Sequence, residues 1–148
     1  MPTPIEFIIF ATMQAKEAEA FGFTRNECCR NLKVALHQYW QHRSLQLSSL
    51  SRKSEIPRSR KARKLPLSEC IVEHVVPKME IVNWLMDMEP LTERRVSNLL
   101  RKYYRVMLVT RDEHALLNAS GLRAKMPKAW DRKNVLARYD MVGIKPCL

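Results

Sequence analysis

Two carboxylate–imidazole pairs stand out among the residues that could carry chemistry. Glu73 and His74 are neighbours in the β-branched run C-I-V-E-H-V-V-P, and Glu113 and His114 are neighbours where a helical pattern begins. A carboxylate binds a hard cation through oxygen, and an imidazole with a pKa near neutrality can accept a proton from water. Glu73 therefore offers a metal ligand beside a base, His74. Either Glu113 or His114 can offer the opposing ligand.

The elements that must position these pairs are two short strands in a mostly helical chain. Val, Ile and Cys enrichment between two prolines predicts a strand within 66–77, and 106–109 is a second strand candidate. Thr110 and Glu113 have the spacing of a capping box, which predicts a short helix ending near Gly121. The fold class expected is α+β, mostly helical with a small two-stranded core.

Helical periodicity and capping signals account for much of the remaining chain. Thr24 and Glu27 form another capping box, which predicts the start of a second helix after a first one. The sequence predicts helices at about 5–21, 24–43 and 79–88, a further helix after Thr92, and a helical turn at 135–139. These elements suit one domain over 1–148.

Charge points to a polyanionic partner. The 148 residues include 26 Lys and Arg against 15 Asp and Glu, a formal net charge of +11, which favours nucleic acid first. Segment 44–65 is predicted to be a basic arm or linker between a helical part at 1–43 and the two-stranded core with its C-terminal extension at 66–148. Its basic side chains are expected to contact phosphates. They are Arg52, Lys53, Arg58, Arg60, Lys61, Arg63 and Lys64.

Other function classes lack their sequence patterns. The four cysteines form no C-x-x-C, which argues against a zinc finger and fits a reducing cytoplasm. The apolar run at 7–13 is too short to cross a bilayer and has no basic flank, so we expect no membrane partner and a cytoplasmic location. Only three glycines are present, and no glycine-rich loop for a nucleotide.

Over about residues 69–118 the sequence resembles the HNH, or ββα-metal, nuclease superfamily. E-H-V-V-P matches the family's first strand, and V-M-L-V-T-R-D-E-H matches its second strand and following helix. By this resemblance His74 is the general base, Glu73 a metal ligand and His114 the ligand from the helix, in a ββα-metal-like core. The resemblance implies a divalent-metal-dependent endonuclease acting on DNA rather than RNA, with Mg²⁺, or else Mn²⁺ or Zn²⁺, as the cofactor.

The chain also departs from that family. Two predicted helices replace a short loop between the two elements, and the structural zinc cysteines of many members are absent. Glu73 and His74 lie on opposite faces of a regular strand. Both can therefore reach one metal only if the strand bends or ends before Pro77. The alternative is a non-catalytic basic nucleic-acid-binding or regulatory protein with structural histidines. A homo-oligomer and an acidic protein partner are further alternatives.

Overall fold

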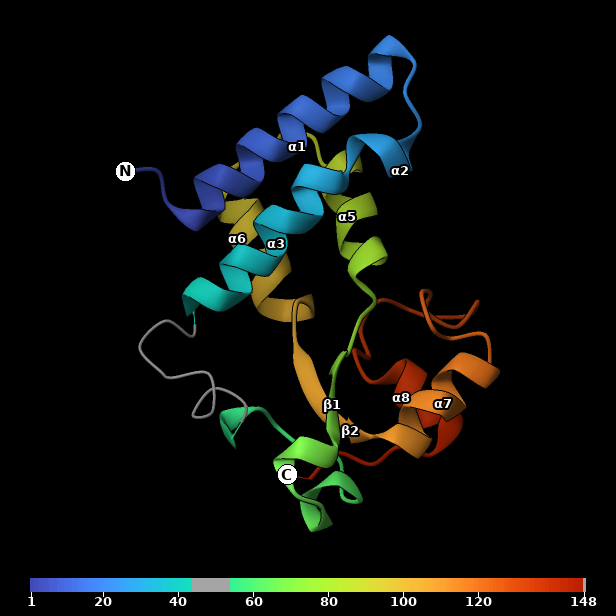
Figure 1. Cartoon of the computed structure of the whole chain (residues 1–148). Helices are drawn as coiled ribbons and strands as arrows, with labels where there is room; N and C mark the ends of the chain where they lie inside the picture. The colour runs from blue at the N-terminus through green and yellow to red at the C-terminus, as the bar shows by residue number, and fades with distance from the viewer. Residues whose placement is uncertain (44–53, 148) are drawn as a thin grey trace.

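A layer of helices lies above a small sheet, and two further helices pack beside that sheet (Figure 1). The structure, a computed structural model, describes residues 1–43 and 54–147. The helical half contains α1 (Pro4–Phe21), α2 (Arg25–Cys28), α3 (Arg30–Arg43), α5 (Lys78–Asp87) and α6 (Glu93–Tyr103). The sheet half contains β1 (Cys70–His74), β2 (Val106–Thr110), α7 (Arg111–Ala119) and α8 (Ala137–Val142), with 3₁₀ turns at Ala62–Lys64 and Leu67–Glu69. The mostly helical α+β class is confirmed.

Helix starts follow the capping signals in the sequence. The predicted boxes of Thr24 with Glu27 and of Thr110 with Glu113 are both formed, each with the threonine side chain accepting from the glutamate backbone N–H. The helix predicted from 24 to 43 is instead divided into α2 and α3 at Cys29, whose backbone angles (φ −89°, ψ 7°) depart from those of an α-helix. The Cys29 side chain is fully buried.

The helical half is built around close packing of α1 on α3. Ala11 and Ala15 are buried with Leu32 and Leu36 in one apolar cluster that also receives side chains from α5 and α6. Alanine at these positions leaves no long side chain between the two helices, so their backbones approach closely. None of the helices among the described residues is long and apolar enough to cross a membrane.

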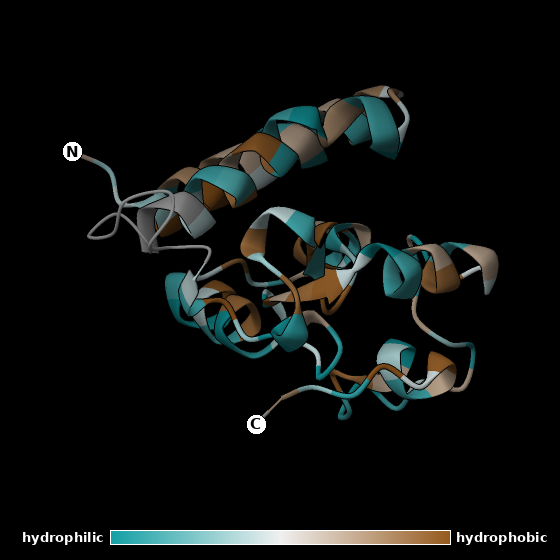
Figure 2. Ribbon diagram, turned by 60° about the horizontal axis from the view of Figure 1, so that its bottom comes forward, coloured by the Kyte–Doolittle hydropathy of each residue, from teal (hydrophilic) through white to brown (hydrophobic). Residues whose placement is uncertain are grey.

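β1 and β2 pair antiparallel although two helices, α5 and α6, separate them in the chain. Glu73 lies opposite Met107 and His74 opposite Val106. Met107 packs with Val109 and residues of α7 and α8, whereas Leu108 packs with Cys70 on the other side. Because side chains alternate along a strand, Glu73 belongs to the face covered by α7 and α8 and His74 to the opposite face. Figure 2 shows apolar residues (brown) in the central strands.

The described residues of the basic segment pack against the sheet, whereas the sequence predicted an arm or linker there. Ser59 N–H donates to Leu108 O at 2.9 Å, and Leu108 N–H donates to Pro57 O at 2.8 Å. Residues 57–59 therefore run along the edge of β2 that β1 leaves open. Small side chains permit this approach, since Ser59 and Ala62 are both fully buried.

Leu108 is the apolar centre of this junction, so its truncation is a direct test of the packing. Leu108 is fully buried, and Leu108→Ala is expected to lower the free energy of unfolding by about 2–5 kcal/mol in urea denaturation. Leu116→Ala is the matched control because Leu116 is 45% exposed on α7, and it should change stability by about 0.5 kcal/mol or less. Equal losses in both variants would contradict the docked arrangement.

Candidate functional site

Glu73 and His114 meet between β1 and α7. His114 Nδ1 lies 2.8 Å from Glu73 Oε2, with side-chain exposures of 34% and 12%. An ionised carboxylate only accepts hydrogen bonds, so Nδ1 carries the proton and Nε2 remains as the second nitrogen of the ring. His114 is in the first turn of α7, which follows β2 directly, and this places its ring beside the neighbouring strand. Of the four residues in the two pairs, these two converge.

Arg138 of α8 holds the carboxylate from the other side. Its guanidinium is fully buried and donates to Glu73 Oε1 at 2.9 Å. It also donates to the backbone carbonyl oxygens of Leu122 at 2.6 Å, Val75 at 3.3 Å and His74. Each Glu73 oxygen thus has its own partner, a guanidinium or an imidazole. Arg138 was not predicted from the sequence, in which it is only a basic residue within a short apolar turn.

His74 occupies a different environment on the opposite face of β1. Its ring stacks on Tyr104, with the ring centroids 5.4 Å apart, and its Nδ1 is buried without a hydrogen-bond partner among the described residues. Burial lowers the pKa of His74 to about 4, helped by the positive charges of Lys78, Arg138 and His37 and opposed by Glu73. The imidazole is therefore neutral at pH 7.

Glu113 is engaged in structure rather than in the convergent pair. It is 4% exposed, and its Oε2 accepts from Ser59 Oγ at 2.6 Å and from Thr110 N–H at 2.9 Å. The carboxylate therefore caps α7 and fastens the segment that runs along β2. A ligand role for Glu113 has no support in this geometry, and the capping box already signalled that its carboxylate was occupied.

Residues 57–59 of the basic segment lie across β2 from Glu73, because they run along one edge of β2 and β1 occupies the other. Arg58 is half-buried, and the remaining described side chains, Arg60, Lys61, Arg63 and Lys64, are exposed. Arg52 and Lys53 lie outside the described residues.

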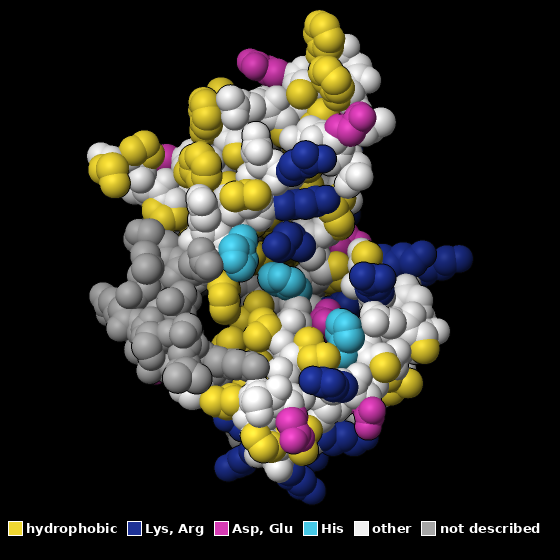
Figure 3. All heavy atoms as spheres, viewed as in Figure 1, with side chains coloured by type: hydrophobic (Ala, Val, Ile, Leu, Met, Phe, Trp, Pro, Cys, Tyr) yellow, Lys and Arg dark blue, Asp and Glu magenta, His cyan; other side chains and the backbone are white. Residues whose placement is uncertain are grey.

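Other cations gather near the histidines. Lys78 begins α5, and burial lowers its pKa, with a further contribution from the charge of Lys33 on α3. Lys78 in turn is the strongest charge acting on His74. Figure 3 shows Lys and Arg side chains (dark blue) running along the helical half toward the histidines (cyan), with an acid (magenta) beside one of them. The positive charge near His74 therefore comes from Lys78 of α5, with Lys33 of α3 close to that lysine.

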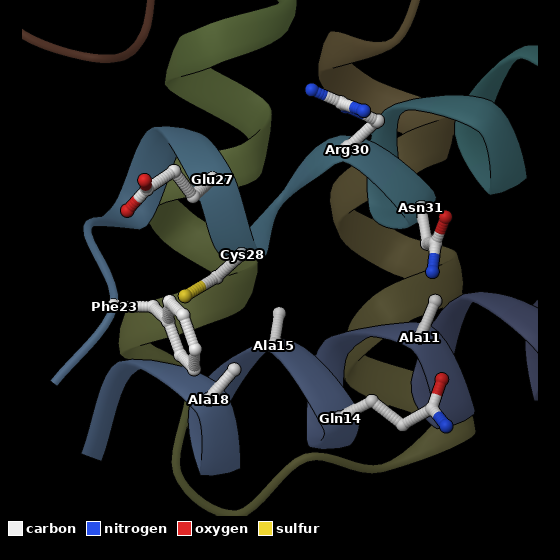
Figure 4. A pocket seen from close by; sticks show the side chains of 9 residues that line it. All are labelled: Ala11, Gln14, Ala15, Ala18, Phe23, Glu27, Cys28, Arg30 and Asn31. Atoms are coloured by element: carbon white, nitrogen blue, oxygen red, sulfur yellow. The ribbon is translucent and has the colours of Figure 1, made fainter. Parts of the chain in front are cut away.

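A pocket of about 620 Å³ lies elsewhere, among α1, α2 and α3 (Figure 4). Alanines of α1 and Phe23 form much of its wall, and Cys28 points into it. Its acid, Glu27, is occupied in the capping box with Thr24. The pocket contains neither Glu73 nor His114 and presents no pair of groups suited to acid–base chemistry.

Comparisons with protein-family models, curated proteins and solved structures gave no match to this chain. The fold and the site define a mostly helical α+β protein with a carboxylate–imidazole pair between a strand and a helix. The interpretation of that pair rests on its own geometry.

Removing the Arg138 guanidinium should destabilise the site and the fold together. Arg138→Met leaves four carbonyl oxygens and one carboxylate oxygen without their donor, and we expect the free energy of unfolding to fall by about 3–5 kcal/mol in urea. Arg123→Met is the control, since Arg123 is exposed, and it should change stability by about 0.5 kcal/mol or less. A tolerated Arg138→Met would show that the guanidinium does not hold β1.

Stability should depend on pH through His74. Its pKa of about 4 in the fold lies below its ordinary value of 6.5, so the unfolded chain binds the proton first as pH falls. The stability contributed by the neutral ring is present above about pH 6.5 and is lost toward pH 4. Urea unfolding in EDTA at several pH values should show a smaller acid loss for His74→Gln than for the unaltered chain. Parallel losses would contradict the buried neutral imidazole.

Proposed function

We propose that the chain is a divalent-metal-dependent endonuclease that hydrolyses phosphodiester bonds in DNA at the Glu73–His114 pair. The observation that carries the proposal is the 2.8 Å contact between a strand carboxylate and a helix imidazole, in which the helix directly follows the second strand of the sheet. Oxygen and nitrogen donors on two fixed elements suit a cation that binds phosphate oxygen. The formal net charge of +11 favours an anionic substrate.

The donor set fits Mg²⁺ or Mn²⁺ better than Zn²⁺. No group of three His, Cys, Asp or Glu close enough to hold a metal occurs in the described part of the chain. Catalytic Zn²⁺ usually has three protein ligands, whereas Mg²⁺ keeps several waters and needs one or two. Glu73 and His114, whose Oε2 and Nδ1 atoms are 2.8 Å apart, are the residues that would hold such a cation, through a carboxylate oxygen and a ring nitrogen. When bound, the cation would stabilise charge on the phosphate.

The two histidines divide the remaining roles in this proposal. His114 would hold the cation through a ring nitrogen that carries no proton, and Arg138 keeps the carboxylate of Glu73 in place. His74 is neutral at pH 7, which is the state a general base needs, although its pKa of about 4 makes it a weak one. The four free cysteines suit the reducing cytoplasm in which we place the reaction.

A second candidate is a non-catalytic nucleic-acid-binding protein. Two observations favour it: His74 lies on the opposite face of β1 from Glu73, and the described residues hold no three-donor group. The exposed cations would then bind phosphates, and the Glu73–His114 contact would serve only to join β1 to α7.

Cleavage of supercoiled plasmid with Mg²⁺, Mn²⁺ or EDTA separates the two candidates. Glu73→Gln and His114→Ala should each lower the cleavage rate by about a hundredfold or more and raise the metal concentration required, because each removes a ligand. His74→Ala should lower the rate without changing the metal requirement. Asp112→Asn is the control, since Asp112 is exposed on the same turn of α7.

Cleavage that persists in EDTA would overturn the metal role. DNA binding without cleavage under every metal would favour the second candidate. Thermal unfolding of each variant shows whether a lost rate reflects a lost fold.

A further inference from the structure

Three aromatic side chains from distant parts of the chain contact one another away from the Glu73–His114 pair. Trp84 of α5 lies 4.7 Å, centroid to centroid, from Tyr103 at the end of α6 and 5.6 Å from Trp130 in the segment between α7 and α8. Tyr103 also donates a hydrogen bond to Arg132 O at 2.7 Å. All three rings are half-buried rather than enclosed, so part of their surface faces solvent.

A pocket of about 480 Å³ opens beside these rings. Trp84 and Tyr103 form part of its wall, and Arg95 and Arg132 bring two guanidinium groups to it. The Arg132 guanidinium lies 5.5 Å from the centroid of Trp84. The acid in the wall, Asp87, is neutralised by Arg25 at 3.0 Å. The pocket thus joins an aromatic wall to cations.

The elements that contribute to the pocket are strongly basic. α6 with the two residues that follow it, together with the segment at 122–136, carries ten Lys and Arg against Glu93 and Asp131. None of these ten cations forms an ion pair within the part of the chain that the structure describes. They are Arg94, Arg95, Arg101, Lys102, Arg105, Arg123, Lys125, Lys128, Arg132 and Lys133. Figure 1 shows the segment between α7 and α8 rising toward the lower end of α5.

We propose that this aromatic–basic surface binds single-stranded nucleic acid, with an unpaired base stacked against Trp84 in the pocket and the backbone phosphates on the surrounding cations. Aromatic rings stack on any base whose face is free, and a basic surface attracts the phosphates regardless of sequence. In a duplex both faces of each base are already covered by neighbouring pairs, so the rings favour a single strand. The ten cations that form no ion pair among the described residues would repel a cationic ligand from the aromatic wall.

The inference goes beyond the proposed cleavage and does not rest on it. Neither Glu73 nor His114 lines this pocket, so binding here requires no metal and no hydrolysis. The two can therefore fail separately: binding of a single strand in EDTA tests this surface, and plasmid cleavage tests the pair.

The test measures how tightly the full chain binds a fluorescent oligothymidylate of about twelve nucleotides in EDTA. Binding is monitored by anisotropy and by tryptophan fluorescence. Oligouridylate and a DNA duplex of the same length are compared at low and high salt. Trp84→Leu removes the stacking ring but keeps an apolar side chain, and Arg95→Ala with Arg132→Ala removes the pocket cations. Arg60→Ala with Lys61→Ala is the matched control, since both lie exposed on the basic segment instead.

We expect a single strand, of DNA or RNA, to bind more tightly than the duplex and to quench tryptophan fluorescence. Trp84→Leu and the Arg95/Arg132 pair should each weaken binding by about tenfold, against about twofold for the Arg60/Lys61 pair. Should Trp84→Leu unfold, the Arg95/Arg132 pair still decides the question. Equal losses in the two double variants, tighter duplex binding, or binding without quenching would each overturn the proposal.

Discussion

The buried ion pair of Arg138 and Glu73 is the interaction on which the site depends. A guanidinium that is fully excluded from water costs several kcal/mol unless a carboxylate and further acceptors surround it. Glu73 supplies the charge, and carbonyl oxygens at the end of β1 and at Leu122 supply the acceptors. Because the same carboxylate also contacts His114, one ion pair fixes a strand, two helices and the connecting segment relative to each other.

The pleat of β1 is the second constraint, since it separates two residues that are adjacent in sequence. Glu73 joins the layer of α7 and α8, whereas His74 faces Tyr104 and the positive charge of Lys78. The two groups therefore differ in the side chains that they contact. Glu73 and His74 could hold a single metal only if β1 ended in a turn that brought one side chain toward the other. The pairing of His74 with Val106 instead keeps the strand regular as far as His74.

Local signals in the sequence predicted the elements, and long-range contacts decided the site. The capping boxes at Thr24 and Thr110 and the apolar spacing of the helices depend on residues a few positions apart, which the sequence displays directly. Arg138 meets a partner 65 residues away in an otherwise undistinguished turn. The basic segment was predicted as an arm because its charge is evident, whereas its pairing with β2 depends on an open strand edge that no local pattern reveals.

Positive charge gathers in several regions, and each region lies at a different place in the fold. Residues 57–59 of the basic segment lie across β2 from Glu73, Arg95 of α6 and Arg132 line the aromatic pocket, and Lys78, with Lys33 near it, lies near His74. Burial lowers the pKa of both Lys78 and His74, with a smaller contribution from nearby positive charge, so the fold disfavours the protonated form of each group. A phosphate group of the proposed substrate, bound beside Lys78, would instead favour the protonated lysine.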